Sequence, residues 1–206
     1  RGAVLHVAGA TGPGAALALG ATAYGGAPVT ASTRYDLASV TKVTACLPVL
    51  LSLVQAGEVA LTDRVDRFFG NAGWMQEPSL GGVTVEDLVL HRSGLPAWRP
   101  LFAWVESRGT AVANALQTSL SEPRGRHLYS DIGVIVLTAI VERAAGQRID
   151  ACARQAVFEP LGMRSTSYGP LFADGGAPPD VAATEDDGLR GLLAGRVHDE
   201  NADAMG

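Results

Sequence analysis

The chain of 206 residues has few lysines, few cysteines and no long apolar run. Its longest apolar stretch, residues 45–54, is shorter than the eighteen or so residues of a membrane-spanning helix, and Pro48 interrupts it. No membrane span is therefore expected. Basic runs longer than two residues are also missing, and the net charge of −5 argues against a nucleic-acid partner.

The two cysteines, Cys46 and Cys152, fall on apolar faces of expected helices. Buried free thiols are the preferred interpretation, because free cysteine is among the most buried residue types. A disulfide stays an alternative, since two cysteines alone do not identify the redox compartment.

Lysine is the scarcest charged residue: among the sixteen lysines and arginines, Lys42 is the only lysine. It lies in the stretch YDLASVTKVTACLPVLLSLVQAGEVAL, residues 35–61, whose apolar residues recur with helical spacing. Pro48 lacks a backbone N–H, so it should kink this helix. The face expected to be buried consists of Val43, Cys46, Leu47, Leu50, Leu51 and Val54. A lysine at the buried-looking start of such a helix requires a chemical reason.

Two strands are expected at the beginning of the chain, over residues 2–9 and 14–24, as a hairpin around the turn 11–14. From residue 62 to about 158 the pattern is helical. The clearest helices are expected over residues 85–91, 101–120, 130–146 and 149–157. From residue 170 onward, Gly, Pro and Asp dominate and the periodicity fades, so an irregular segment is expected.

Capping signals support two of these helices. Thr84 and Asp87 form a capping box before the helix at 85–91. The most apolar helix begins after Ser130 or Asp131, either of which can cap it, and ends at Gly146. Strands followed by helices indicate an α+β fold rather than alternating strands and helices. Two strands do not form a stable sheet alone, so further strands must pair with them.

Ser39 and Lys42 form the pattern S-x-x-K, which places both side chains on one face of the helix start. The first turn of a helix offers free backbone N–H groups that can stabilise an oxyanion. A serine there can attack a carbonyl if the amine accepts its proton. Burial lowers the pKa of a lysine and allows it to act as a base, whereas arginine stays charged. This chemistry explains the retained lysine, although S-x-x-K alone is a weak signal.

Tyr129 stands in the stretch HLYSDIG, just before the most apolar helix. A phenol beside a lysine can share or relay the proton of the serine. The alternative is an aromatic side chain that packs on the core at a helix start. Taken alone, Tyr129 favours this alternative; together with S-x-x-K, it favours a catalytic role.

Five stretches of the chain resemble one family, that of the serine β-lactamases, D-alanyl-D-alanine peptidases (penicillin-binding proteins) and class C-like esterases. S-x-x-K is a nucleophile motif of this family. The order and spacing of the stretches match along essentially the whole chain. They are DLASVTK (residues 36–42), LVLHRSGLP (88–96), YSDIG (129–133), FEPLGM (158–163) and VHDENA (197–202).

The resemblance implies that Ser39 is the nucleophile, Lys42 its base and Tyr129 the tyrosine of a Y-x-N motif. The third residue of that motif departs from the family, because Asp131 replaces the usual asparagine. A carboxylate there would hold Lys42 charged and could not donate to a substrate carbonyl. Asp131 therefore has two competing interpretations, as a substrate-binding residue and as a helix cap.

Histidines and acidic residues suggest two further sites. His91 and Ser93 could form a Ser-His pair, but the resemblance implies that their turn is a structural link between helices. Residues 185–187 and 198–200 could bind a cation, yet solvated loops are preferred, because the spacing fits no ligand rule. We expect no metal site and no cofactor.

The implied fold is an α+β, β-lactamase/transpeptidase-like fold of several lobes. One domain over residues 1–206 is expected, with a sheet lobe and the nucleophile helix at 1–60, a helical lobe at 61–169 and an irregular segment at 170–206. The implied function is a serine hydrolase that forms an acyl-enzyme with an ester, amide or β-lactam carbonyl of a small-molecule or peptidoglycan-derived substrate. The alternative is a non-catalytic peptidoglycan-binding or regulatory module. The resemblance also implies a bacterial protein and leaves its compartment open, with export to the cell envelope as one option.

The family also has a third motif, K-T-G or H-x-G, on a strand beside the nucleophile. No lysine or histidine followed by x-G occurs after Ser130. We therefore expect that the remaining strands of the sheet are missing from this chain, that the hairpin has an open edge, and that these residues alone hydrolyse substrates poorly.

Overall fold

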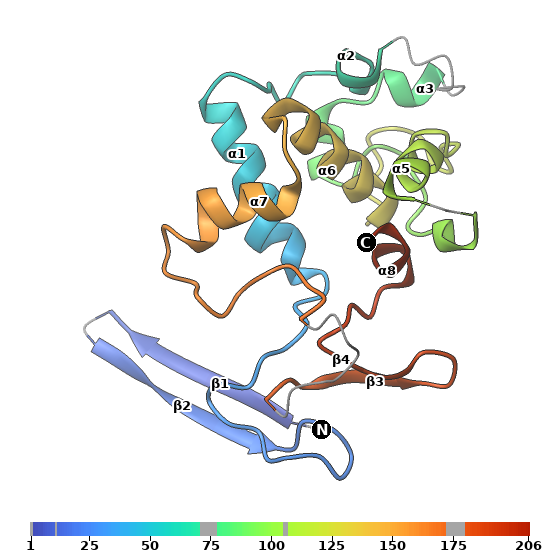
Figure 1. Cartoon of the computed structure of the whole chain (residues 1–206). Coiled ribbons are helices and arrows are strands. Elements are labelled where there is room, and N and C mark those ends of the chain that lie inside the picture. The colour runs from blue at the N-terminus through green and yellow to red at the C-terminus, as the bar shows by residue number, and fades with distance from the viewer. Residues whose placement is uncertain (1, 11, 71–77, 105–106, 172–179) are drawn as a thin grey trace. The chain divides into compact units, whose positions relative to one another are not determined.

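The computed structural model describes residues 2–10, 12–70, 78–104, 107–171 and 180–206 (Figure 1). The contacts divide the chain into two compact units. The first unit contains residues 1–38 and 168–199, and the second contains residues 39–167 and 200–206. The helix that begins after Ser39 thus belongs to the second unit.

The first unit begins with the predicted hairpin of β1 (Gly2–Gly9) and β2 (Gly12–Gly20). The strands are antiparallel and pair Leu5 with Leu17. The second strand starts and ends earlier than predicted, at Gly12 and Gly20 rather than at residues 14 and 24. Side chains alternate between the two faces of a strand, so Leu5, Val7, Leu17 and Leu19 share one face, and each is more than half exposed.

A second hairpin, β3 (Ala183–Asp187) and β4 (Gly191–Ala194), forms a separate two-stranded sheet in the same unit. Helix α8 (Glu200–Met205) follows and belongs to the second unit. The expectation of an irregular segment from residue 170 is therefore wrong for residues 183–205. The sequence ATEDD of β3 has no apolar alternation, so periodicity could not reveal this strand.

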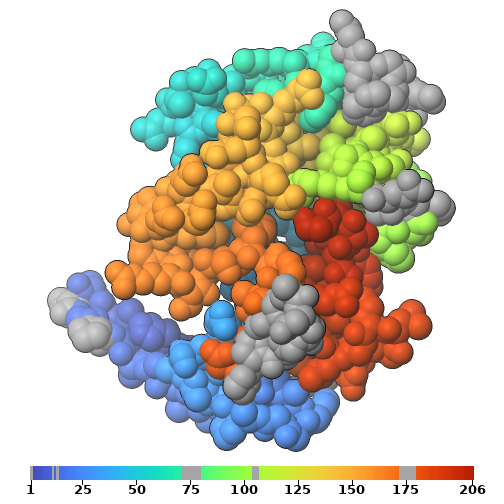
Figure 2. Space-filling view, in the orientation of Figure 1, coloured from blue at the N-terminus to red at the C-terminus, as the bar shows by residue number. Residues whose placement is uncertain are grey.

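Helix α6 (Asp131–Ala145) forms in the second unit where the sequence predicted the most apolar helix, over residues 130–146. It begins after Ser130, whose side chain accepts a hydrogen bond from the N–H of Gly133, and it ends at Gly146 with a left-handed φ of 68°. In the described part of the chain, the α-helices that pack on it include α1 (Leu47–Gln55), α2 (Val65–Phe69), α4 (Val85–Val89), α5 (Arg108–Leu116) and α7 (Ile149–Ala153). Figure 2 shows α6 and α7 in direct contact on the surface.

The remaining helical segments refine two predictions. The stretch expected as one helix at 101–120 consists of the 3₁₀ helix η2 (Leu101–Trp104) and of α5. The helix expected at 149–157 is α7 followed by the π-helical segment η3 (Arg154–Phe158). A short helix α3 (Pro78–Gly81) precedes α4. Within the described residues, no helix is long and apolar enough to cross a membrane.

The helix after Ser39 contains a π-helical turn, η1 (Lys42–Cys46), before α1. The N–H of Leu47 bonds to the carbonyl of Lys42, five residues earlier, and Pro48 then stands in the first turn of α1, where its missing N–H costs little. The wide turn shifts the phase of the helix, so two expected core residues, Val43 and Leu51, are 60% and 52% exposed. The residues buried there are Ala45, Cys46, Val49 and Leu50.

The predicted capping box begins α4. The side chain of Thr84 accepts from the N–H of Asp87 at 3.1 Å, and the carboxylate of Asp87 accepts from the N–H of Thr84 at 3.0 Å. Both cysteines are free and buried, as preferred from the sequence.

Candidate active site

The side chains of Ser39, Lys42 and Tyr129 meet in the helical unit. Lys42 Nζ lies 2.9 Å from Ser39 Oγ, and the Tyr129 hydroxyl also lies 2.9 Å from Ser39 Oγ. Lys42 Nζ stands 5.4 Å from the centre of the Tyr129 ring. Ser39 is exposed, so an incoming molecule can reach its hydroxyl. The three residues predicted to act together are therefore in hydrogen-bonding contact.

The backbone turns sharply just before Ser39. Ala38 has a left-handed φ of 45°, which is unfavourable for a residue with a Cβ. The carboxylate of Asp36 accepts a hydrogen bond from the N–H of Ala38 at 2.7 Å and so stabilises this turn. Ser39 consequently lies at the beginning of the helix, and Lys42 follows one turn later at the first residue of η1.

The segment that carries Tyr129 is anchored through its neighbour Ser130, which is fully buried. Ser130 Oγ donates to the carbonyl of Pro96 at 2.6 Å and accepts from the N–H of Gly133 at 2.9 Å. Ser130 is therefore the cap of α6, and the alternative that Asp131 caps this helix is wrong.

Asp131 contacts Lys42 instead. Its Oδ1 lies 2.8 Å from Lys42 Nζ, and the side chains are 33% and 23% exposed. Burial lowers the pKa of Lys42, but the hydrogen bonds and charges of Asp131 and Tyr129 outweigh burial and raise that pKa above its ordinary value of 10.5. The expectation that burial would lower the pKa of Lys42 is thus wrong, whereas the expectation that a carboxylate at position 131 would hold the amine charged agrees with the raised pKa.

His91 and Ser93 do not form a Ser-His pair. Ser93 Oγ accepts a hydrogen bond from the N–H of Leu95 within the turn, at 3.3 Å. The ring of His91 lies on the ring of Tyr129, with 4.6 Å between their centres, and its Nδ1 accepts from the N–H of Ser130 at 3.1 Å. Sequence reasoning missed this contact; the signal was a histidine directly after a helix end, where glycine or asparagine is usual.

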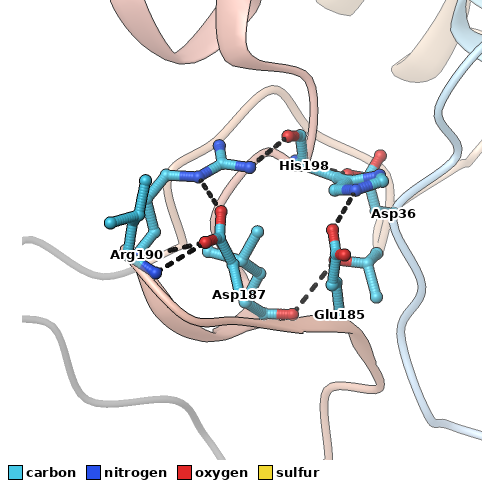
Figure 3. A network of polar contacts seen from close by, with 8 residues as sticks. Asp36, Glu185, Asp187, Arg190 and His198 are labelled. Atoms are coloured by element: carbon cyan, nitrogen blue, oxygen red, sulfur yellow. Dashed lines mark hydrogen bonds and ion pairs between the residues drawn. The ribbon is translucent and has the colours of Figure 1, made fainter.

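The acidic residues near the C-terminus form ion pairs in the first unit (Figure 3). His198 Nε2 lies 2.7 Å from Glu185, and the N–H of His198 donates to the carboxylate of Asp36 at 3.2 Å. Arg190 bonds both Asp187 and the carbonyl of His198. Among the described residues, no three His, Cys, Asp or Glu side chains are grouped as metal ligands.

A small cavity of about 230 Å³ lies elsewhere in the helical unit. It is lined by Arg99, Leu101, Asn114 and Gln117 and includes none of the residues around Ser39.

Comparison with known proteins gives a consistent relationship. The family model described as Beta-lactamase matches residues 1–199. A putative D-alanyl-D-alanine carboxypeptidase of Salmonella gallinarum is 30% identical over 191 residues, which covers 81% of this chain and 44% of that protein. The chain thus spans less than half the length of this relative.

Two solved structures share the fold. The octameric penicillin-binding protein homologue from Pyrococcus abyssi is 24% identical with a TM-score of 0.71, over 94% of this chain and 46% of that chain. A beta-lactamase/D-alanine carboxypeptidase from Yersinia pestis, complexed with citrate, is also 24% identical, with a TM-score of 0.63 over 75% and 46%. The fold is therefore β-lactamase/transpeptidase-like, and since the family model matches nearly all residues, this chain belongs to the beta-lactamase family.

Proposed function

We propose that the protein is a serine hydrolase in which Ser39 forms an acyl-enzyme with a D-alanyl-D-alanine peptide. The observation that carries this proposal is the position of Ser39 Oγ, 2.9 Å from both Lys42 Nζ and the Tyr129 hydroxyl. A serine hydroxyl between two proton-exchanging groups is the arrangement that nucleophilic catalysis needs. The name of the Salmonella gallinarum relative supports the peptide substrate.

The first step is an attack by Ser39 Oγ on the carbonyl carbon. Because the pKa of Lys42 is raised, the amine rests as an ammonium, so the proton of Ser39 passes to the Tyr129 oxygen while the phenolic proton of Tyr129 moves on towards the leaving nitrogen of the substrate. The ammonium stabilises the negative charge on the Tyr129–Ser39 pair. The backbone N–H of Ser39, in the first turn of its helix, can donate to the oxyanion that forms on the substrate.

The second step returns the proton. Tyr129 delivers it to the leaving amine as the carbon–nitrogen bond breaks, which leaves the acyl group as an ester on Ser39. A water molecule then attacks this ester and gives a proton to Tyr129, whose own phenolic proton passes to Ser39 Oγ as the ester bond breaks and the carboxylic acid leaves. No metal or cofactor takes part in either step.

Labelling at Ser39 tests this proposal. The protein should react with a fluorophosphonate probe and with a fluorescent penicillin, and intact mass should show one adduct. Ser39→Ala should abolish the adduct, whereas Ser52→Ala, on the same helix, should label normally. Full labelling of Ser39→Ala would overturn the assignment. A panel of a D-Ala-D-Ala peptide, short-chain esters and a chromogenic cephalosporin then identifies the substrate class.

The ion pair between Lys42 and Asp131 supports a second candidate, a peptidoglycan-binding module without catalysis. A permanently paired ammonium does not accept a proton, so Ser39 would stay unreactive. Binding of peptidoglycan fragments without any adduct at Ser39 would favour this candidate.

A further inference from the structure

We infer that His91 is a positioning residue for Tyr129, which it holds against Ser39 only while its imidazole is neutral. This inference rests on the proposed function, in which the hydroxyl of Tyr129 exchanges a proton with Ser39. The turn after α4 then has a role in the reaction, in addition to linking two helices.

The backbone at His91 is the first observation. Helix α4 ends in a left-handed turn: the N–H of His91 bonds to the carbonyl of Leu88 at 3.2 Å, and the N–H of Arg92 bonds to that of Asp87 at 2.7 Å. Glycine is the usual residue there, because a left-handed backbone strains a residue with a Cβ. α6 ends in this way at Gly146, but α4 has His91, with φ of 53°. The strain points to a function for the side chain.

The side chain and backbone of His91 together bracket Tyr129. The carbonyl of His91 accepts from the N–H of Leu128 at 2.8 Å, and its Nδ1 accepts from the N–H of Ser130 at 3.1 Å. Between these two bonds, the His91 ring lies on the Tyr129 ring at 4.6 Å, with 36° between their planes. One residue therefore fixes the backbone on both sides of Tyr129 and also the face of its ring.

Any residue at this position offers the carbonyl, so histidine adds two things: an aromatic face and an acceptor nitrogen. Nδ1 can accept from Ser130 only if the ring proton is on Nε2, and a protonated imidazole has no acceptor left. Protonation would direct an N–H of His91 at the N–H of Ser130 and remove the anchor. The neutral imidazole is thus the working form.

The charges around the ring favour this neutral form. The titratable groups that face His91 are His127, Tyr129, Lys42 and Asp131. Burial lowers the pKa of His91 below its ordinary value of 6.5, and the charges of His127 and Lys42 lower it further, while Asp131 acts in the opposite direction. His91 is therefore neutral at pH 7 and becomes charged only in acid.

Two variants separate the roles of the ring and the acceptor. His91→Phe keeps an aromatic face but lacks the acceptor, and it leaves a buried N–H of Ser130 without a partner. His91→Asn keeps an acceptor oxygen and tolerates a left-handed backbone, but it lacks the ring. We expect His91→Phe to slow fluorophosphonate acylation of Ser39 about 10- to 100-fold with unchanged reversible binding of the probe, because misplacement affects the reacting geometry. His91→Asn should recover part of this loss.

His127→Ala is the matched control, because His127 meets His91 only edge-on, at 6.1 Å between ring centres. It should acylate within about twofold of the unmodified protein. The dependence of the acylation rate on pH is the decisive measurement. The rate of the unmodified protein should fall in acid as His91 takes up a proton, and this decrease should be missing in His91→Asn. Thermal unfolding identifies any variant that is merely unfolded.

Nitrogen NMR of the His91 ring reports which ring nitrogen is protonated, and it does not depend on enzymatic activity. Nδ1 should be unprotonated and Nε2 protonated at pH 7. A proton on Nδ1, or acylation rates and acid limbs unchanged in both variants, would overturn the inference while Ser39 labelling still supports the proposed function. If the unmodified protein does not label at Ser39, the proposed function fails instead, and the NMR result decides whether His91 still anchors Ser130.

Discussion

Asp131 Oδ1 lies 2.8 Å from Lys42 Nζ, so the residue two places after Tyr129 holds the only lysine of the chain as an ammonium. In the wider family, the resemblance places an asparagine at this position, and an amide has no charge to pair with the amine. The substitution therefore changes the protonation of the site and not only its hydrogen bonds to substrate.

Asp131→Asn should move the pH dependence of acylation to lower pH. Asp131 raises the pKa of Lys42, and removal of its negative charge therefore lowers that pKa. A shift of about one pH unit is expected from an opposite charge at this distance. The measurement is the rate of fluorophosphonate labelling from about pH 6 to about pH 12, a range that includes the ordinary pKa of a lysine. An identical profile in the variant would show that Asp131 does not control the pKa of Lys42.

Lys42→Arg should be nearly inactive even though it preserves the positive charge. The Lys42 ammonium contacts Ser39 Oγ and stabilises the charge that develops there, and arginine is too large to keep this contact. We expect acylation to slow on the order of 10²–10³-fold, the effect of removing one electrostatic contact to the reacting atoms. Arg126→Lys, in an exposed ion pair with Glu122, is the reciprocal control and should be unaffected. An active Lys42→Arg would show that the positive charge suffices without the contact to Ser39 Oγ.

Thr84→Ala should destabilise the helical unit through α4. The Thr84 side chain caps the helix, and its loss leaves the N–H of Asp87 without that acceptor. Loss of such a cap costs about 1 kcal/mol of unfolding free energy. Denaturant unfolding measures the change, and Thr84→Ser, which keeps the hydroxyl, should restore most of it. Equal stability of Thr84→Ala and the unmodified protein would contradict the capping role.

Asp187 should titrate far below an ordinary carboxyl. Its Oδ1 accepts from the N–H of Leu189 at 2.7 Å, its Oδ2 accepts from Arg190 Nε at 2.7 Å, and these bonds lower its pKa to about 2. Because the folded pKa is depressed, the contribution of Asp187 to the β3–β4 turn persists above pH 3.8 and is lost as pH falls through about 2. Carbon NMR of the carboxyl, with the Leu189 amide as a second reporter, checks this value; titration near 3.8 would refute it.

The capped helices could be predicted because their signals are local. Thr84 and Asp87 stand three residues apart, and the apolar run after Ser130 ends at a glycine, so short-range hydrogen bonding determines both ends. The strand β3 could not be predicted, because its charged residues are stabilised by partners elsewhere in its unit, such as His198 for Glu185. The π-helical turn η1 likewise has no sequence pattern that distinguishes it from an α-helix. Val43 and Leu51, which are exposed, were therefore expected on the buried face of the helix.

The contacts among Ser39, Lys42 and Tyr129 could be predicted, while their catalytic roles stay a prediction. Ser39 and Lys42 are one helical turn apart, so their contact follows from spacing, and the family resemblance added Tyr129. The sequence contained two opposite effects on the pKa of Lys42, burial and the carboxylate of Asp131, and the 2.8 Å distance between Asp131 and Lys42 decides in favour of the carboxylate. The contact of His91 with Tyr129 required the left-handed backbone, which sequence spacing does not show.

The π-helical turn η1 has a consequence for insertions and deletions. It contains one more residue than an α-helical turn, between Ser39 on one side and the core residues Val49 and Leu50 on the other. Deletion of a single residue within η1 would restore regular winding and leave Ser39 on nearly the same side of the helix relative to that core, because five π-helical residues turn through about the same angle as four α-helical ones. A one-residue deletion there should therefore disturb the direction of Ser39 less than a deletion within the regular helix α1, where every lost residue rotates the preceding segment by about 100°.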